Sequence, residues 1–247
     1  MSAGEPILVG RTVTRRFGGL VAVNNVDIDV REGEIFGLIG PNGAGKTTLF
    51  RLMSGVYRPS SGTITLRGTE IGGRAAHEVN ALGIATTHQI VRPFAEMPVE
   101  KNVLVGVLYG RSGLRGRAAD AEVERILELT ELAPHRATLG QSLTLARRKR
   151  LEVARALATR PDVLLLDEVA AGLNPTESAR MIELIRKIRA SGVTIVMVEH
   201  VMKAIMSLSD RIMVMDLGQR IALGTPAEIA NDPAVIKAYL GERAVAS

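Results

Sequence analysis

The chain has 247 residues, of which 46% are hydrophobic, 23% charged and 3% aromatic, and it contains no cysteine. This composition excludes a disordered or low-complexity chain, disulfides and thiolate metal sites, and it leaves few rings on which nucleic-acid bases could stack. The net charge of +5 suits anionic small ligands, lipid surfaces and nucleic acid equally well. Neither a signal peptide nor an apolar run of the ~18–20 residues that span a bilayer is expected, so a membrane role would require a partner.

Short apolar strands alternate with helical patterns along the chain, which predicts an α/β fold with a mostly parallel sheet. Alternating Val26, Ile28 and Val30 indicate a half-exposed strand. A denser strand over Glu34–Ile39 runs through glycine-rich residues into a helix near Lys46–Met53. The remaining expected elements are strands at Thr63–Leu66, Gly83–Thr87, Val163–Leu166, Val193–Val198 and Ile212–Met215, a helix over Pro175–Ala190 and a hairpin turn at Asp216–Gln219.

The strand pattern stops between about Ile90 and Arg160. Arg111–Arg117 is expected to be a solvated loop, and a helix is expected over Leu143–Thr159. The spacing of Val123, Ile126, Leu127 and Leu132 predicts another amphipathic helix. We therefore expect one domain over residues 1–247, with a core at about 1–89 and 161–247 and a helical subdomain inserted at about 90–160.

The most specific motif is a glycine-rich stretch between the expected strand and helix. Its context is that of a phosphate-binding loop, in which backbone N–H groups and the helix N-terminus bind phosphates. Lys46 would reach the β- and γ-phosphates, and the Thr47 hydroxyl would bind Mg²⁺. A glycine-rich turn with an incidental lysine is the alternative, and the context makes it the weaker one. The residues are Gly40, Pro41, Asn42, Gly43, Ala44, Gly45, Lys46, Thr47 and Thr48.

Two acids end the apolar run Val163–Leu166. Asp167 and Glu168 would lie at the carboxyl end of a buried strand, which is where open α/β sheets bind ligands. Asp167 could hold Mg²⁺ and Glu168 could polarise an attacking water. Alone, the pair could equally begin a solvated loop; together with a phosphate loop it favours catalysis.

With these motifs the chain resembles an ABC-type ATPase, the nucleotide-binding subunit of a transporter, over about Ile7–Glu242. The resemblance implies a P-loop (RecA-like) ATPase core with an N-terminal antiparallel β subdomain and an inserted helical subdomain. It also implies ATP and Mg²⁺ as cofactors.

The resemblance assigns roles to single residues that carry little signal alone. Phe17 would stack on adenine, and Val23 would lie beside the nucleotide. Gln89 would contact Mg²⁺ or the attacking water and sense a membrane subunit. His200 would form a hydrogen bond to the γ-phosphate. Without the resemblance, each of these is more often a core or surface residue.

The family's signature, usually Leu-Ser-Gly-Gly-Gln, is altered in this chain. Thr144 keeps a hydroxyl for the γ-phosphate of a partner's nucleotide, Ala146 replaces a glycine, and Arg147 replaces a neutral amide. Residues 148–157 match the family's helix, which favours a divergent signature over a lost one. The aligned residues are Leu143, Thr144, Leu145, Ala146 and Arg147.

A second family segment would contact the partner ATPase. Here Asn174 also reads as a helix N-cap, with Pro175 in the first turn and Glu177 completing a capping box. The structural and functional interpretations are compatible. The residues of this dimer-contact loop are Ala171, Gly172, Leu173 and Asn174.

Four segments resemble the ATPases of branched-chain amino acid importers, namely Arg16–Leu20, Ala171–Pro175, Glu199–Lys203 and Gly224–Glu242. Urea, amide and lipopolysaccharide systems use similar subunits. The resemblance implies a head-to-tail dimer with itself or a related ATPase, peripheral at the cytoplasmic face of the inner membrane. It also implies two membrane permease subunits, with a periplasmic binding protein acting indirectly.

The permeases are expected to dock on an apolar surface around Gln89, Phe94, Met97 and Val99, although buried loop hydrophobes are an equal alternative. A nucleic-acid or ribosome ATPase is disfavoured because the chain has one phosphate loop and no heptad run. A regulatory module without hydrolysis stays open because of the altered signature. The interpretation carried forward is a transport ATPase with no nucleic-acid partner.

Overall fold

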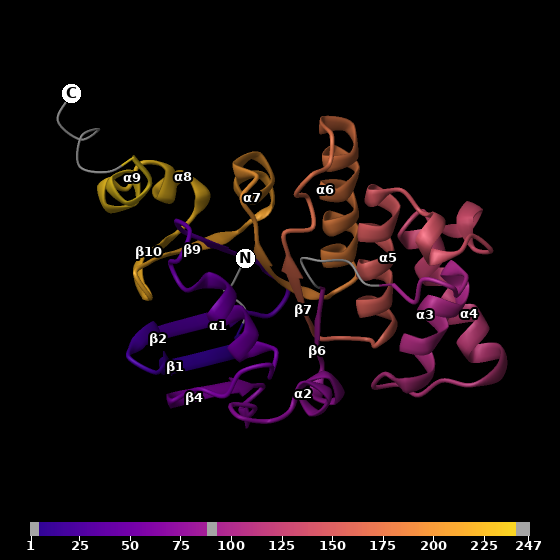
Figure 1. Ribbon diagram of the computed structural model, residues 1–247, viewed down its shortest axis with the longest axis horizontal. Coiled ribbons are helices and arrows are strands. Elements are labelled where there is room, and N and C mark those ends of the chain that lie inside the picture. The colour runs from indigo at the N-terminus through magenta and orange to yellow at the C-terminus, as the bar shows by residue number, and fades with distance from the viewer. Residues whose placement is uncertain (1–4, 88–92, 241–247) are drawn as a thin grey trace. The chain divides into compact units, whose positions relative to one another are not determined.

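The computed structural model describes residues 5–87 and 93–240, coloured along the chain in Figure 1. They fall into two compact units: Met1–Val79 with Thr194–Ser247, and Asn80–Val193. The second unit contains strands as well as helices, so this division differs from the expected one into a core and a helical insertion. The expected subdomain boundaries at 90 and 160 remain a prediction.

An antiparallel sheet forms one part of the first unit (Figure 1). Its strand order is β2-β1-β4-β5, and Val26, Ile28 and Val30 of β2 are buried as their alternation predicts. Strand β1 was not expected, because left-handed Thr12 and a shift in register interrupt its alternation. The bounds are β1 Pro6–Phe17, β2 Leu20–Arg31, β4 Ser61–Leu66 and β5 Thr69–Glu70.

Parallel pairing builds the other part of the first unit. Strand β3 pairs in parallel with β8 and β9, and β10 returns antiparallel along β9. The expected hairpin turn is confirmed: Leu217 and Gly218 both have positive φ, as a tight two-residue hairpin requires. The bounds are β3 Ile35–Ile39, α1 Lys46–Met53, β8 Thr194–Val198, α7 Met202–Leu208, β9 Arg211–Asp216, β10 Gln219–Gly224, α8 Pro226–Ala230 and α9 Pro233–Leu240.

The second unit pairs β6 (Ile84–Thr86) in parallel with β7 (Val163–Asp167), after the short helix α2 (Ala76–Leu82). Helix α6 (Pro175–Ala190) begins where the sequence predicts. Asn174 caps it in a reciprocal capping box with Glu177.

Three further helices of this unit share an apolar core: α3 Val99–Tyr109, α4 Gly116–Leu129 and α5 Leu145–Ala158. Helix α3 was not expected, because apolar residues surround most of its circumference and hide the helical period. Two expectations were wrong in detail: α4 begins inside the predicted Arg111–Arg117 loop, and Leu132 is buried beyond the end of that helix.

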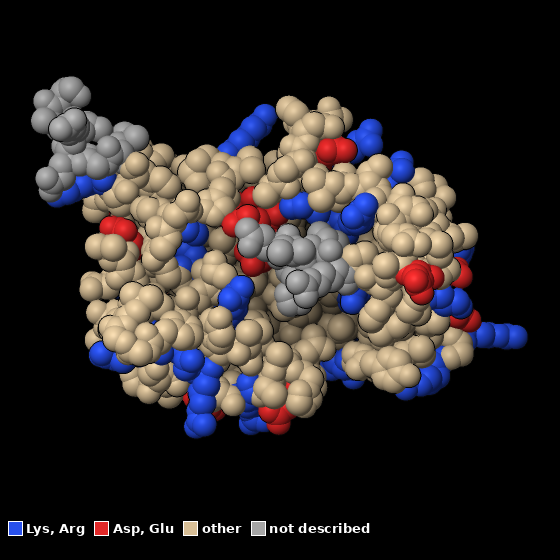
Figure 2. Space-filling model, viewed as in Figure 1, with Lys and Arg blue, Asp and Glu red and all other residues tan. Residues whose placement is uncertain are grey.

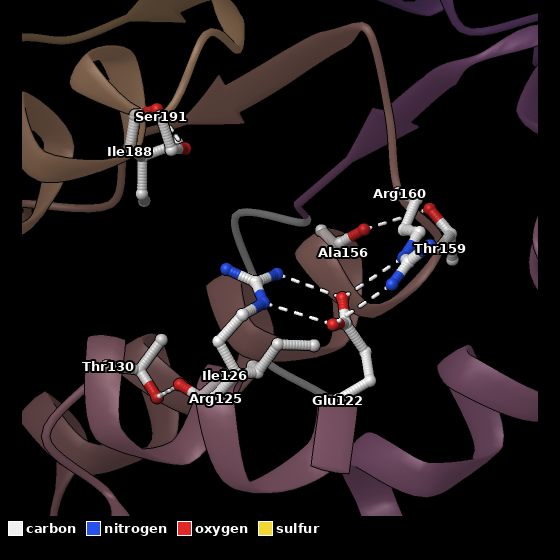
Figure 3. A network of polar contacts seen from close by, with 9 residues as sticks. All are labelled: Glu122, Arg125, Ile126, Thr130, Ala156, Thr159, Arg160, Ile188 and Ser191. Atoms are coloured by element: carbon white, nitrogen blue, oxygen red, sulfur yellow. Dashed lines mark hydrogen bonds and ion pairs between the residues drawn. The ribbon is translucent and has the colours of Figure 1, made fainter. Parts of the chain in front are cut away.

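Glu122 of α4 ties this helix to the chain that follows α5 (Figure 3). Its carboxylate accepts hydrogen bonds from Arg125 Nε and Nη2 at 3.0 and 2.9 Å and from Arg160 Nε and Nη2 at 3.2 and 3.1 Å. The side chain is only 6% exposed, and the two guanidinium groups lower its pKa to about 2.

Among residues 5–87 and 93–240, no helix has the length and apolarity to cross a bilayer. Lysine and arginine side chains, drawn in blue, lie in separate groups among other residues on the face shown in Figure 2.

Candidate functional site

Residues 40–45 turn the chain from the buried strand β3 into helix α1. Gly40, Gly43 and Gly45 all have positive φ, and a Cβ atom at Gly40 or Gly45 would lie 2.0 or 2.3 Å from a backbone carbonyl oxygen. These carbonyls belong to Met215 and Ala22. Only glycine fits both positions, because the loop packs closely against these two carbonyls.

Lys46 is the first residue of α1, and its side chain is 6% exposed. Its Nζ donates to the carbonyl oxygens of Gly40 at 2.7 Å and of Pro41 at 2.9 Å, so the ammonium folds back over the loop. Thr47 is exposed at the N-terminus of the helix, where its hydroxyl is accessible to a cation. The loop therefore combines a buried cation, a helix N-terminus and open backbone, which together can bind a polyphosphate.

Other parts of the first unit hold this loop in place. The Gly218 N–H, in the turn between β9 and β10, donates to the carbonyl of Ala44 at 3.1 Å. Of the other loop residues, Asn42 and Gly43 are exposed, Ala44 is buried, and Pro41 and Thr48 are half-buried.

Phe17 ends strand β1 with its ring 38% exposed, whereas Val23 of β2 is fully buried. Phe17 can therefore present a ring face to a ligand. Val23 can act only as support beneath the surface. Arg15 and Tyr57 pack against the Phe17 ring.

His200 follows strand β8 by two residues and is exposed, next to the buried Glu199. Strand β8 begins at Thr194, one residue later than predicted. The imidazole is accessible and can form a hydrogen bond with an anionic ligand.

In the second unit, Asp167 ends strand β7 and Glu168 follows with a left-handed backbone at φ 49°. The Thr87 hydroxyl accepts a hydrogen bond from the Asp167 N–H at 3.1 Å. The nearly buried Lys149 donates to the Glu168 carbonyl at 2.6 Å. Both carboxylates are half-buried, and their backbone is held from two other elements.

The altered signature lies at the start of α5. Thr144 is the N-cap, and its hydroxyl accepts from the Arg147 N–H at 3.5 Å. Leu143 is buried in the helical core, Leu145 and Arg147 are exposed, and Ala146 is half-buried. The threonine therefore does what a serine would do at this position, and its hydroxyl hydrogen remains able to donate.

A pocket of about 280 Å³ joins this signature to the expected dimer-contact loop. Thr144, Ala146 and Arg147 line one part, and Leu173 and Glu177 line another. In the loop Ala170 is buried, Ala171 is half-buried, and Gly172 takes a left-handed φ of 74° before the Asn174 cap. The structure thus brings together two segments that the sequence identified separately.

Comparison with known proteins identifies this arrangement. Residues 23–171 match the family model "ABC transporter". The chain is 44% identical over 252 residues to LivG of Salmonella typhimurium, a high-affinity branched-chain amino acid transport ATP-binding protein, covering 96% of this chain and 99% of LivG. This chain belongs to the ABC transporter ATPase family. It is therefore an ATP-binding transporter subunit, as its resemblance predicts.

Other relatives of this ABC ATPase agree. BraF of Pseudomonas aeruginosa, another branched-chain amino acid transport ATP-binding protein, is 42% identical, with 96% of this chain and 99% of BraF covered. Residues 219–245 match the model "Branched-chain amino acid ATP-binding cassette transporter". A nucleotide-free ABC transporter cassette superposes with a TM-score of 0.85 at 28% identity, covering 96% and 100% of the two chains. The fold prediction is confirmed.

A second solved structure, an ATP-binding cassette of an ABC transporter in its ADP conformation, also superposes with a TM-score of 0.85 at 28% identity. The alignment covers 96% of this chain and 99% of that one. Nucleotide binding is thus a property of the fold to which this chain belongs.

The expected docking residues have different environments. Gln89 lies outside the described residues. Phe94 is 41% exposed with the Arg155 guanidinium 4.7 Å from its ring centre, Met97 is half-buried and Val99 is fully buried. Val99 is part of the helical core, so of the two alternatives that the sequence left open, the buried one holds at this position.

Sequence reasoning missed Arg15, Tyr57, Thr87 and Lys149. Arg15 precedes Phe17 by two residues in a strand, which was a usable signal that both side chains lie on one side. Tyr57, Thr87 and Lys149 reach Phe17, Asp167 and Glu168, respectively, only because the fold brings distant segments together.

Proposed function

We propose that this ABC ATPase is the ATP-hydrolysing motor subunit of an importer for branched-chain or other hydrophobic amino acids. One observation carries this proposal: the chain aligns almost end to end with LivG at 44% identity. The match of residues 219–245 to the branched-chain family model supports it from a segment outside the general ATPase model.

The residues of the first unit would bind the nucleotide. Lys46 would leave the carbonyls of Gly40 and Pro41 and neutralise the β- and γ-phosphates, which is what a buried, pre-positioned ammonium can do. The loop N–H groups would bind the remaining phosphate oxygens. Phe17 would stack on adenine through its exposed ring, and His200 would donate to the γ-phosphate.

Acids and hydroxyls would supply the catalytic step. Thr47 and Asp167, with Gln89, are hard oxygen donors of the kind that Mg²⁺ prefers. A bound Mg²⁺ would neutralise charge that develops on the phosphates. Glu168 would orient the attacking water, and Lys149 on its carbonyl would keep this half-buried carboxylate in one place.

A second ATPase subunit, either another copy or a paralogue, would complete each site. The pocket-lining Thr144 and Arg147 and the loop at residues 171–174 are proposed to face the partner's nucleotide. Two membrane permeases would bind each pair at the cytoplasmic face of the inner membrane, and a periplasmic binding protein would deliver the substrate. Of the residues expected to dock a permease, Phe94 would make the contact, because its side chain is exposed.

The test of motor function is Mg-ATP hydrolysis by the purified chain at increasing protein concentration. A rate per molecule that rises with concentration is expected, because the site needs a second subunit. Glu168→Gln should lower kcat by at least about 100-fold while ATP still binds. An unchanged kcat in Glu168→Gln would contradict the role of Glu168. Lys46→Ala should abolish ATP binding.

Substrate is tested in vesicles that contain this chain with its permeases and binding protein. Uptake of leucine, isoleucine and valine driven by internal ATP is expected, and Glu168→Gln should abolish it. Uptake of urea or short amides instead would overturn the substrate assignment and keep the motor function.

A further inference from the structure

Arg15 lies over the ring of Phe17 at the end of strand β1. The guanidinium carbon is 4.6 Å from the Phe17 ring centre and 5.6 Å from that of Tyr57. The two rings meet edge to face, with their centres 5.3 Å apart and their planes at 73°. One cation therefore contacts both rings, in the geometry that aromatic quadrupoles favour.

The cluster of Arg15, Phe17 and Tyr57 is anchored to the segment that follows helix α1. Arg15 Nη1 donates to the carbonyl of Arg58 at 2.8 Å. The Ser60 N–H donates to the Thr14 carbonyl at 2.7 Å, and the Arg16 N–H donates to the Ser60 hydroxyl at 3.1 Å. Three hydrogen bonds thus fix the end of β1, so the guanidinium stays on one side of the Phe17 ring.

A second arginine extends the cluster to the phosphate-loop helix. Arg51 lies in the last turn of α1, and its Nη1 donates to the Tyr57 hydroxyl at 3.0 Å. Its guanidinium carbon is 5.6 Å from the Tyr57 ring centre. The ring of Phe17 is therefore connected, through Tyr57, to the helix that begins at Lys46.

Arg15 and Tyr57 leave part of Phe17 exposed, and the two glycines that follow it are uncrowded. The residue remains 38% exposed, and a Cβ atom at Gly18 or Gly19 would meet no atom within 4 Å. The surface of Phe17 that the cluster leaves exposed is available to a planar base.

We propose that Arg15 is a positioning residue for the nucleotide base. Its guanidinium supports Phe17 from one side so that a purine stacks on the other, an inference that rests on the proposed function, in which Phe17 receives adenine. A ring held in one rotamer before binding loses less conformational entropy when the base arrives. The effect belongs to the base alone, because the phosphates bind at Lys46 and the loop.

The experiment compares two ligands that differ by the nucleoside. Dissociation constants of ATP and of inorganic tripolyphosphate are measured by calorimetry for the wild type and for Arg15→Met, which keeps the side-chain length and removes the cation. ATP should bind about 5-fold more weakly, the size expected for a half-exposed cation–π contact, with tripolyphosphate changed less than about 2-fold. Arg15→Lys should recover part of the ATP affinity, since it keeps the charge and loses the planar group.

Arg11→Met is the matched control, because Arg11 is an exposed arginine of the same strand that contacts no aromatic ring among the described residues. It should change neither dissociation constant. Equal weakening of ATP and tripolyphosphate in Arg15→Met would show a general charge or folding effect and overturn the inference. Unchanged binding of both ATP and tripolyphosphate in Arg15→Met would also overturn the inference. Should Arg15→Met not fold, Arg15→Lys must by itself weaken ATP selectively.

Two further variants separate this inference from the function on which it rests. Phe17→Ala should weaken ATP more than Arg15→Met does and leave tripolyphosphate unchanged. Selective loss in Phe17→Ala but not in Arg15→Met would overturn only the role of Arg15. No loss in Phe17→Ala would overturn base stacking on Phe17 and the present inference with it, whereas ATP binding by Lys46→Ala would overturn the proposed nucleotide site.

Discussion

Gly33 and Gly45 share a left-handed backbone but differ in the space beside the α-carbon. Gly33 has φ 75° and an empty Cβ position, whereas a Cβ at Gly45 would lie 2.3 Å from the Ala22 carbonyl oxygen. Backbone strain and steric exclusion can therefore be separated with one substitution in each place.

We expect Gly33→Ala to lower the free energy of unfolding by about 1–2 kcal/mol, the cost of a left-handed alanine. Gly45→Ala should cost about 2 kcal/mol more, because the loop must also move away from Ala22, and should weaken ATP binding. Urea unfolding and calorimetry measure the two effects. Equal losses of stability would show that the phosphate loop relaxes freely.

Leu217 adopts a left-handed backbone conformation that leucine disfavours. It occupies the first turn position of the β9–β10 hairpin at φ 44° and is 81% exposed. Asparagine tolerates this conformation better than leucine does. Leu217→Asn should therefore raise the free energy of unfolding by about 0.5–1 kcal/mol, measured as a higher urea midpoint. An unchanged or lower midpoint would contradict this explanation.

At the scale of elements, the ion pairs of Glu122 join α4 to the segment after α5 (Figure 3). We expect Glu122→Gln to lower the free energy of unfolding by about 2 kcal/mol at pH 7, because a buried carboxylate loses charge-assisted bonds to half-exposed arginines. Glu124→Gln on the same helix is the control; its partner Arg136 and Glu124 itself are both exposed, so the loss should be below about 0.5 kcal/mol.

The pH dependence has a definite sign. The folded pKa of Glu122 is about 2, below its ordinary value of 4.5, so its contribution is complete above pH 4.5 and is lost as the pH falls toward 2. The difference in urea midpoint between wild type and Glu122→Gln should therefore be constant from pH 7 to 5 and shrink below pH 4.5. A difference independent of pH would mean that shape, not charge, causes the loss.

How far sequence alone reaches depends on whether a feature is local. The turn at Leu217, the cap at Asn174 and the loop before Lys46 follow from adjacent residues, and each was predicted correctly. Helix α3 was not, because its uniform apolarity carries no period. The support of Phe17 by Tyr57 was invisible, because these rings meet only after β1 and the segment following α1 come together.

At the scale of the whole molecule, the phosphate loop is held in place by segments that lie far away in the sequence. Strands β8 and β9 flank β3, and Gly218 in the β9–β10 turn donates to Ala44. We expect ATP to slow amide hydrogen exchange at Gly218 as well as within residues 40–45, because a bound phosphate holds the loop against its support. Exchange in the β4–β5 hairpin should not change. Protection confined to residues 40–45 would contradict this coupling.

The hydrogen bond between Gly218 and Ala44 has a consequence for synthesis on the ribosome. The loop emerges early, but β8, β9 and the β9–β10 turn are translated long afterwards, and each contacts β3 or the loop that follows it. Until the β9–β10 turn has left the exit tunnel, the nascent chain holds a nucleotide motif without its scaffold. Nucleotide capture by this protein is accordingly a late event, which follows the synthesis of that turn.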